Sequence, residues 1–348
     1  MNCRHCWQHK RIDEDSMVPD GNNAEIPPAD LFRVIKEAKE LGLYSIKFTG
    51  GEPFMNPLFI DYLNIAKNEG LRVVIETNGT LLEESHIPRL KALNLREIAI
   101  SLDGANQETH DNFRQKKGAY LQTLAALKLL AKYKLPVQLI MCIHRKNKDE
   151  LGDLLLLAEQ YKVNSVKINP IQPMGRGQEL AEKGECLPLS ELLELSKYCR
   201  ENLSKSFSGN LFFGLPISFR PFEEIRDRTF SVCQIFSILG LLSGGELSFC
   251  GIGHNNRELI FGNIYEDSLP DVWKGAPLLN ELRQCLPKGL KGVCGRCLLK
   301  STCLGECRAE AYERTGDLLA PHWICQEALD SNLFPTTRLL PAADKLKE

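Results

Sequence analysis

The feature that most constrains this chain is a set of seven cysteines from residue 233 to residue 325, a stretch that also contains an eighth, Cys285. The chain has 13 cysteines in 348 residues, so more than half of them fall in less than a third of its length. Thiolates in runs such as CGRCLLKSTCLGEC can converge on a metal, because a loop of two or three residues lets both sulfurs point to one side. The seven are Cys233, Cys250, Cys294, Cys297, Cys303, Cys307 and Cys325.

Three kinds of cysteine site compete for this pattern. Disulfide bonds are disfavoured, because nothing at the start of the chain resembles a secretory signal and intracellular thiols stay reduced. Zinc remains open, since a CxxC pair followed by a second pair of cysteines is also zinc-ribbon spacing. Iron–sulfur ligation is the third, and the cysteine spacing alone does not separate it from zinc.

Composition limits the class of protein. A length of 348 residues suggests one large domain or two. With 43% hydrophobic and 25% charged residues, the chain can bury an ordinary globular core. The net charge of −2 gives no electrostatic case for nucleic acid, and no apolar run approaches the ~20 residues needed to cross a membrane. We therefore expect a cytoplasmic protein with neither a nucleic-acid nor a membrane partner.

Strand and helix patterns alternate through the first two thirds of the chain, after a polar stretch over 8–27 that reads as a loop. Helical spacing of apolar residues predicts helices over 30–41, 58–69, 81–93, 120–132, 150–161 and 190–203. Short apolar runs predict strands over 44–48, 71–75, 97–102, 137–143 and 163–169. Such alternation favours βα units and a parallel sheet, whose active face lies at the carboxyl ends of the strands.

Short polar motifs stand at these strand ends. The chain opens MNCRHCW, a CxxC pair followed by an aromatic residue. Three motifs then follow successive strands, with His110, Asp111 and Arg114 after the last: Gly50-Gly51-Glu52-Pro53, Glu76-Thr77-Asn78-Gly79 and Ser101-Leu102-Asp103-Gly104. In this order the motifs resemble those of the radical S-adenosylmethionine enzymes. The cysteine array after residue 230 resembles the SPASM domain that many of them carry, which favours iron–sulfur over zinc.

The resemblance implies an α/β fold: a partial (β/α)6 TIM-like barrel followed by a small cysteine-rich SPASM domain. We expect the barrel over 1–205, a linker over 206–232, the auxiliary iron–sulfur domain over 233–335 and a tail over 336–348.

The family's radical cluster is a [4Fe–4S] cluster held by CxxxCxxC. Its open iron site chelates S-adenosylmethionine, whose cleavage releases a 5′-deoxyadenosyl radical. Cys3 and Cys6 match the second and third cysteines. The first cysteine and the preceding strand have no counterpart here. This predicts either a chain that starts too late or an incomplete radical cluster.

Further site residues are implied by the same resemblance. Gly50, Gly51 and Glu52 would approach the methionine end of the cofactor. Ser101 and Asp103 would approach its ribose, and Arg114 its carboxylate. The loop around Gly175 and the strand residues Met141 and Ile143 would border the adenine, with strand core as the alternative for Met141.

Two auxiliary [4Fe–4S] clusters are implied for the cysteine array. One would be held by Cys294, Cys297, Cys303 and Cys325. The other would be held by Cys233, Cys250 and Cys307, and its fourth ligand stays open, with Cys285 the nearest spare thiol.

The resemblance finally implies an oxidoreductase that modifies a peptide or protein side chain. We expect a peptide maturase that forms a thioether or carbon–carbon cross-link in a ribosomally synthesised peptide. The alternatives are oxidation of Cys or Ser to formylglycine, as in sulfatase maturation, and a non-catalytic metal-binding protein. The expected partners are the peptide or protein substrate, an electron donor such as flavodoxin or ferredoxin, and a separate protein that binds the leader peptide.

Overall fold

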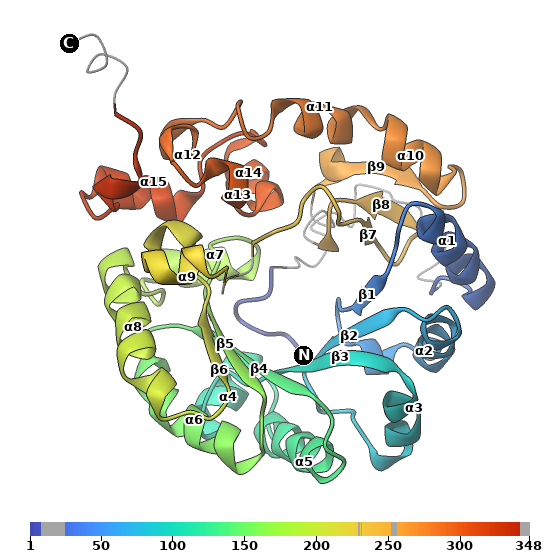
Figure 1. Ribbon diagram of the computed structural model, residues 1–348. Coiled ribbons are helices and arrows are strands. Elements are labelled where there is room, and N and C mark those ends of the chain that lie inside the picture. The colour runs from blue at the N-terminus through green and yellow to red at the C-terminus, as the bar shows by residue number, and fades with distance from the viewer. Residues whose placement is uncertain (8–24, 229, 231, 252–255, 342–348) are drawn as a thin grey trace.

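The computed structural model describes residues 1–7, 25–228, 230, 232–251 and 256–341, so most of the loop expected over 8–27 lies outside the described residues. A six-stranded sheet forms the centre of the amino-terminal part (Figure 1). Its strands pair in chain order and every neighbouring pair is parallel. The strands are β1 (Ser45–Phe48), β2 (Arg72–Thr77), β3 (Asn94–Ser101), β4 (Val137–Ile143), β5 (Ser165–Pro170) and β6 (Asn210–Phe213).

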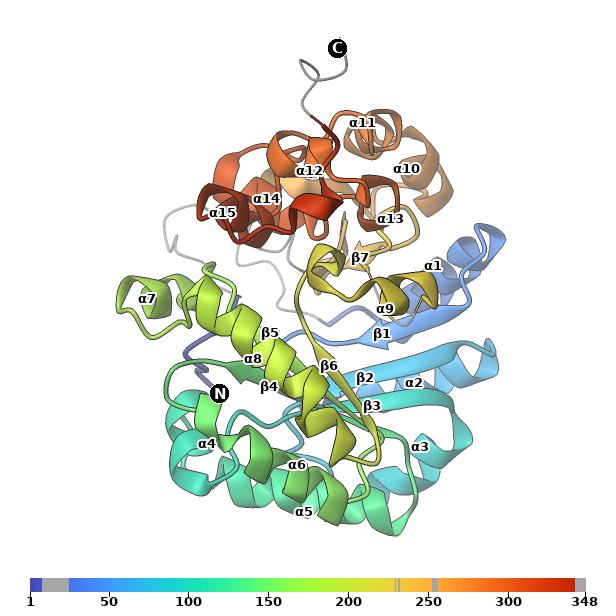
Figure 2. The same ribbon diagram turned by 60° about the vertical axis from the view of Figure 1, so that its left-hand side comes forward.

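Helices cover the outer side of this curved sheet, as Figures 1 and 2 show. Leu63, Leu127 and Leu154 come from three of them and are buried with the strand residues Ile75 and Ile100 in one hydrophobic core. The helices are α1 (Pro28–Glu40), α2 (Phe59–Asn68), α3 (Ile87–Ala92), α4 (Gln107–Arg114), α5 (Ala119–Lys132), α6 (Leu151–Gln160), α7 (Arg176–Glu182) and α8 (Leu189–Glu201). Because all five junctions in the sheet are parallel, the motif-bearing carboxyl ends of its strands lie at one edge.

The five predicted strands are confirmed as β1 to β5, each within a few residues of its expected limits. The structure adds β6, which the sequence analysis did not predict, so the sheet has six strands although the strand expected before the cluster loop has no counterpart. It also adds α4. The helix predicted over 81–93 is shorter than expected: a 3-10 turn at Glu84–His86 precedes α3, and Pro88 stands in the first turn of α3.

The carboxy-terminal part is built of short helices around a three-stranded antiparallel sheet. The strands are β7 (Gly240–Leu241), β8 (Glu246–Ser248) and β9 (Ile260–Asn263). The helices are α9 (Phe222–Arg226), α10 (Leu269–Gly275), α11 (Pro277–Cys285), α12 (Gly292–Arg296), α13 (Lys300–Cys303), α14 (Arg308–Thr315) and α15 (Trp323–Asp330). Within the described residues, no helix combines the length and the apolar character that a membrane span requires.

Hydrogen bonds join this part to the barrel. Arg33 on α1 donates its Nη2 to the carbonyl of Ile264 at 2.7 Å. Glu37, one turn further on, accepts from the backbone N–H of Leu269 at 2.9 Å. The carboxy-terminal part consequently packs across one end of the sheet, as Figure 2 shows.

Candidate cofactor and cluster sites

The amino-terminal segment, residues 1–7, is fixed to the barrel by contacts on both sides. The backbone N–H of Arg4 donates to Phe113 at the end of α4, and that of Arg176 at the start of α7 donates to Cys6, each at 3.0 Å. The side chain of Arg4 forms an ion pair with Glu185 at 2.6 Å. Cys3 and Cys6 are therefore held between two loops of the barrel.

Gly175 allows this segment to approach. Its φ of 55° is a conformation that side-chain-bearing residues rarely adopt. A Cβ at this position would lie 2.5 Å from the carbonyl oxygen of Trp7. The glycine-rich loop that the sequence analysis expected near the adenine thus lies against the segment that carries Cys3 and Cys6.

A buried ion pair lies next to Cys3. The Nε of Arg114 is 2.5 Å from Oδ2 of Asp103, and its Nη1 is 3.7 Å from the sulfur of Cys3. Asp103 is fully buried, and burial alone would raise the pKa of its carboxyl, but Arg114 and His5 outweigh burial and lower that pKa. Asp103 thus stays ionised and orients Arg114 toward Cys3.

Glu52 links the ends of β1 and β2. Its carboxylate accepts from the hydroxyl of Thr77 at 2.5 Å, from the backbone N–H of Asn78 at 2.8 Å and from that of Phe54 at 3.3 Å. These bonds hold the Gly50-Gly51 turn against the Asn78-Gly79 turn. Gly50 has a φ of 121°, so the turn depends on a residue without a Cβ.

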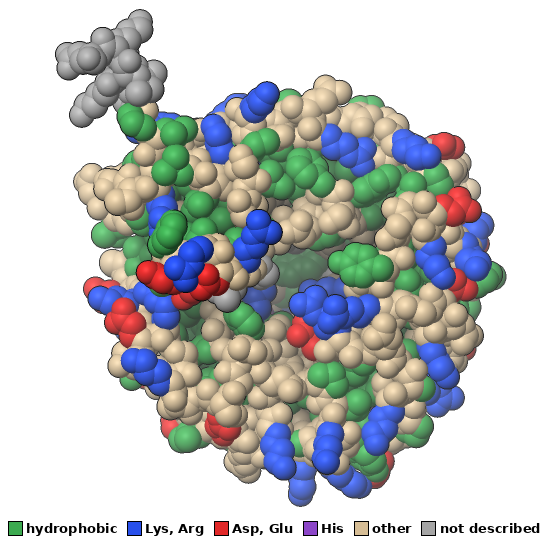
Figure 3. Space-filling model, in the orientation of Figure 1, with side chains coloured by type: hydrophobic (Ala, Val, Ile, Leu, Met, Phe, Trp, Pro, Cys, Tyr) green, Lys and Arg blue, Asp and Glu red, His purple; other side chains and the backbone are tan. Residues whose placement is uncertain are grey.

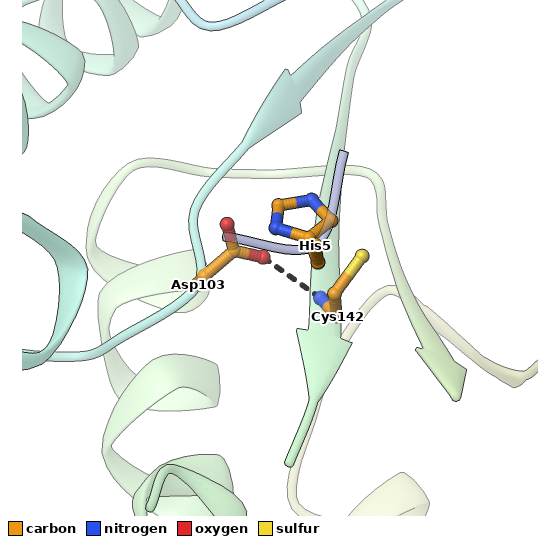
Figure 4. Close-up of side chains that lie close together, drawn as sticks. All are labelled: His5, Asp103 and Cys142. Carbon is orange, nitrogen blue, oxygen red and sulfur yellow. Dashed lines mark hydrogen bonds between the residues drawn. The ribbon is translucent and has the colours of Figure 1, made fainter. Parts of the chain in front are cut away.

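Cys142 lies beside His5 and Asp103, and its backbone N–H donates to the Asp103 carboxylate, as Figure 4 shows. Ligand atoms of these three residues lie within 4.8 Å of one another. Burial lowers the pKa of His5 to about 4, so the imidazole is neutral near pH 7. A metal cation at this spot would compete with Arg114 for the Asp103 carboxylate. We interpret the group as the polar floor of the barrel beside Cys3.

Two residues of β4, Met141 and Ile143, do not lie where the family resemblance implies. Met141 and Ile143 are buried in the hydrophobic core, so the structure does not place them beside an adenine; for Met141 the core alternative is correct. Cys142 lies between them in the strand and is only partly buried. The reason is the two-residue period of a strand, which turns Cys142 to the face opposite its neighbours.

Four cysteines of the array line one pocket in the carboxy-terminal part. Apolar residues, among them Val293 and Phe334, complete its wall. Burial raises the pKa of each of the four thiols, so their deprotonation calls for a bound cation. The lining cysteines are Cys294, Cys297, Cys303 and Cys325, the set expected to hold one auxiliary cluster.

The remaining three cysteines of the array form a second group. Cys233 and Cys250 both contribute to raising the pKa of Cys307, after burial and Glu310, which shows that the three thiols lie near one another. Burial is also the main cause that raises the pKa of Cys233 to about 11. All 13 cysteines, each of them in a described part of the chain, are free of disulfide bonds. Two groups of buried, reduced thiols fit the donor set of iron–sulfur clusters.

The amino-terminal segment contacts the carboxy-terminal part at Trp7. A Cβ at Gly251 would lie 3.1 Å from the Trp7 ring, and Gly251 directly follows Cys250. The segment carrying Cys6 therefore reaches the second group of thiols. Figure 3 shows a hollow between the barrel and the carboxy-terminal part, with hydrophobic side chains inside and both basic and acidic side chains around it.

Several residues of these sites were missed by sequence reasoning. His5 lies inside the CxxC pair and could have been noticed there. The Arg4–Glu185 pair joins residues 181 positions apart and leaves no local signal. Arg308, the fully buried neighbour of Cys307, also escaped notice.

Comparisons with known proteins agree with this layout. Residues 1–158 match the family described as the radical SAM superfamily, and residues 233–298 match the iron–sulfur cluster-binding domain SPASM. The AdoMet-dependent heme synthase of Methanosarcina barkeri is 30% identical over 342 residues, which cover 93% of this chain and 92% of that protein.

A second relative and a solved structure also match over most of this chain. The PqqA peptide cyclase of Gluconobacter oxydans is 24% identical, over 97% of this chain and 93% of its own. The crystal structure of Streptococcus suis SuiB bound to S-adenosylmethionine superimposes with a TM-score of 0.71 at 17% identity, over 93% of this chain and 74% of SuiB. At that identity the SuiB match shows a shared fold alone.

Proposed function

Because this chain belongs to the radical S-adenosylmethionine superfamily and carries a SPASM domain, we propose that it oxidises its substrate with bound S-adenosylmethionine and [4Fe–4S] clusters. When bound, these groups supply the radical that removes a hydrogen atom from the substrate. The observation that carries this proposal is the pair of buried thiol groups beside a barrel whose Cys3 lies next to Arg114.

The chain's own residues would orient these groups. Cys3 and Cys6 would bind the radical cluster, and Arg114 would face the carboxylate of the cofactor. Asp103 would act through Arg114 rather than on the ribose, because its carboxylate is already bound to that guanidinium. Ser101, half-buried at the end of β3, remains the candidate for the ribose. Gly50, Gly51 and the fixed carboxylate of Glu52 would shape the turn at the methionine end.

The two thiol groups would each bind one auxiliary cluster. Cys294, Cys297, Cys303 and Cys325 would hold one, and Cys233, Cys250 and Cys307 the other. We assign 233–335 to this auxiliary domain, followed by a tail over 336–348. The barrel extends beyond the expected limit of 205, because β6 is a strand of its sheet, so the linker of the expected 206–232 is reduced to 214–232.

For the substrate, we propose an iron porphyrin precursor of heme. The relative named as a heme synthase is 30% identical and matches over 92% of its length, against 24% for the peptide cyclase. The hollow in Figure 3 suits such a molecule, because its hydrophobic side chains can contact a macrocycle while the Lys and Arg side chains around it can pair with carboxylates.

A peptide cross-link, thioether or carbon–carbon, is the second candidate. It is supported by the match to the PqqA peptide cyclase, which extends over 93% of that protein. A leader-binding partner protein belongs to this candidate alone. Formylglycine formation stays a further alternative. The non-catalytic alternative is disfavoured because the whole-length relatives are named as enzymes.

Either reaction needs electrons from outside the chain. We propose a small carrier such as flavodoxin or ferredoxin as the donor, and the cytoplasm as the compartment, where thiols stay reduced.

The test is anaerobic turnover of the reconstituted chain with S-adenosylmethionine and a reductant. We expect an iron porphyrin to stimulate formation of 5′-deoxyadenosine and to be converted to heme, as measured by mass spectrometry. Cys3→Ala should abolish both products, whereas Cys199→Ala, in the core of α8, should retain them. If a peptide, and not the porphyrin, stimulates formation of 5′-deoxyadenosine, the second candidate function is the correct one.

A further inference from the structure

Arg308 is the largest fully buried side chain in the described part of the chain. It directly follows Cys307 and begins α14. Its Nη1 donates to the carbonyls of Leu318 at 3.1 Å and Ala320 at 2.7 Å, and its Nη2 donates to that of Gly305. These acceptors are neutral, and among the described residues no carboxylate forms an ion pair with Arg308. The charge is fixed in place without being neutralised.

This guanidinium lies near both thiol groups. Cys294 and Cys303 of the first group and Cys307 of the second are all close enough to interact with it electrostatically. Gly305 permits the position, since a Cβ there would lie 2.6 Å from the Cζ of Arg308. Gly305 also lines the pocket of the first group, so Arg308 packs directly behind that wall.

The Nε of Arg308 is buried and has no hydrogen-bond partner among the described residues. A buried donor left unpaired costs roughly 1–3 kcal/mol, which makes an acceptor at this spot the expected complement. The carboxyl groups of Glu306, Glu310 and Asp317 are near enough to interact with Arg308 electrostatically, but among the described residues none of them forms an ion pair with it.

Arginine keeps its proton in proteins, so a positive charge persists here. An isolated buried charge is costly unless an anion faces it. Iron–sulfur clusters with thiolate ligands are anionic and become more negative on reduction. A fixed positive charge, and a hydrogen bond to a cluster sulfur, therefore favour the reduced form and raise the reduction potential.

We propose that Arg308 is a positioning residue shared by both auxiliary clusters, which raises their reduction potentials and donates its Nε–H to a cluster sulfur. The proposal rests on the assignment of the two thiol groups to iron–sulfur clusters.

The test compares Arg308→Gln with Arg296→Gln in the reconstituted full-length chain. Arg296 is the matched control, because it lies between Cys294 and Cys297 in sequence but is exposed to water. Iron and sulfide are counted first, and the auxiliary potentials are then measured by EPR-monitored redox titration. We expect Arg308→Gln to lower the equilibrium constant for reduction at least tenfold, which is about 59 mV for a one-electron couple. Arg296→Gln should leave it at the wild-type value.

Arg308→Lys provides a second test in case the Arg308→Gln variant does not bind iron. Lysine keeps a positive charge but, unlike arginine, can lose it as the pH rises. We expect the auxiliary potentials of the Lys variant to fall with rising pH more steeply than those of the wild-type chain. A purely structural role for Arg308 would give the Lys variant the wild-type pH profile.

The outcomes separate this proposal from the proposed function. A wild-type chain that binds zinc in place of iron contradicts the cluster assignment itself. A wild-type chain with about eight irons, combined with wild-type potentials in the Gln variant or a wild-type pH profile in the Lys variant, overturns the role of Arg308 alone. A shift as large in Arg296→Gln as in Arg308→Gln also overturns it, since burial would then play no part.

Discussion

Buried charged side chains lie in both the barrel and the carboxy-terminal part. In the barrel, Asp103 and Arg114 are almost completely buried and neutralise each other 2.5 Å apart. In the carboxy-terminal part, Arg308 has only carbonyl partners. The two arginines differ in their partners, and this predicts different consequences of mutation: breaking the barrel pair strands a charge, whereas removing Arg308 changes an electrostatic environment.

Asp103→Asn tests the barrel pair. The substitution keeps the side-chain shape and the oxygen that accepts from the N–H of Cys142, but leaves the Arg114 guanidinium without its counter-ion. We expect the free energy of unfolding to fall by about 3–5 kcal/mol, measured by anaerobic urea titration. Glu84→Gln is the control: it breaks the exposed pair with Lys132 and should leave stability unchanged. Equal stability of Asp103→Asn and the wild-type chain would contradict the ion-pair assignment.

At the scale of elements, the segment 1–7 is held mainly through Arg4. The hydrogen bond with Arg4 is the largest cause that lowers the pKa of Glu185 from 4.5 to about 2, and Lys146 adds to the effect. Because the folded-state pKa is lowered, the ion pair contributes its full stability above pH 4.5 and loses it as the pH falls toward about 2.

Glu185→Gln makes that contribution measurable. We expect the variant to be less stable than the wild-type chain by about 1–2 kcal/mol near pH 7, a value discounted for the partial exposure of both side chains. The difference should shrink as the pH is lowered below about 4.5, because protonation then removes the ion pair from the wild-type chain as well. A difference that stays constant with pH would show that charge is not its source.

The strands and helices also differ in how well the sequence predicts them. The strands β1 to β5 were predicted because each is an apolar run next to a clear helical pattern. The strand β6 has four residues and no such signal, and α4 carries mostly polar side chains, so both were missed. The division of the cysteines into two groups came from the family resemblance and not from their spacing. Neither could reveal that Arg308 lies near both groups or that Trp7 contacts Gly251. Such contacts depend on how distant segments pack, and local periodicity does not encode them.

At the scale of the whole molecule, the barrel and the carboxy-terminal part form one continuous arrangement of sites. Trp7 follows Cys6 and packs on Gly251 beside Cys250, while Arg308 lies near both thiol groups. The order from the barrel outward is thus Cys3 and Cys6, then Cys233, Cys250 and Cys307, then the four-cysteine pocket. This order suits transfer of electrons between the proposed clusters and a substrate bound in the hollow of Figure 3.

The central claim is that the two thiol groups each hold an iron–sulfur cluster, and the most direct test is the content of iron, acid-labile sulfide and zinc per chain after anaerobic reconstitution. The account predicts at least about eight irons with matching sulfide, rising to about twelve if the site at Cys3 and Cys6 is also filled. Cys303→Ala and Cys233→Ala should each remove about four irons, whereas Cys199→Ala should remove none. Zinc with little iron, or equal losses in all three variants, would contradict the claim.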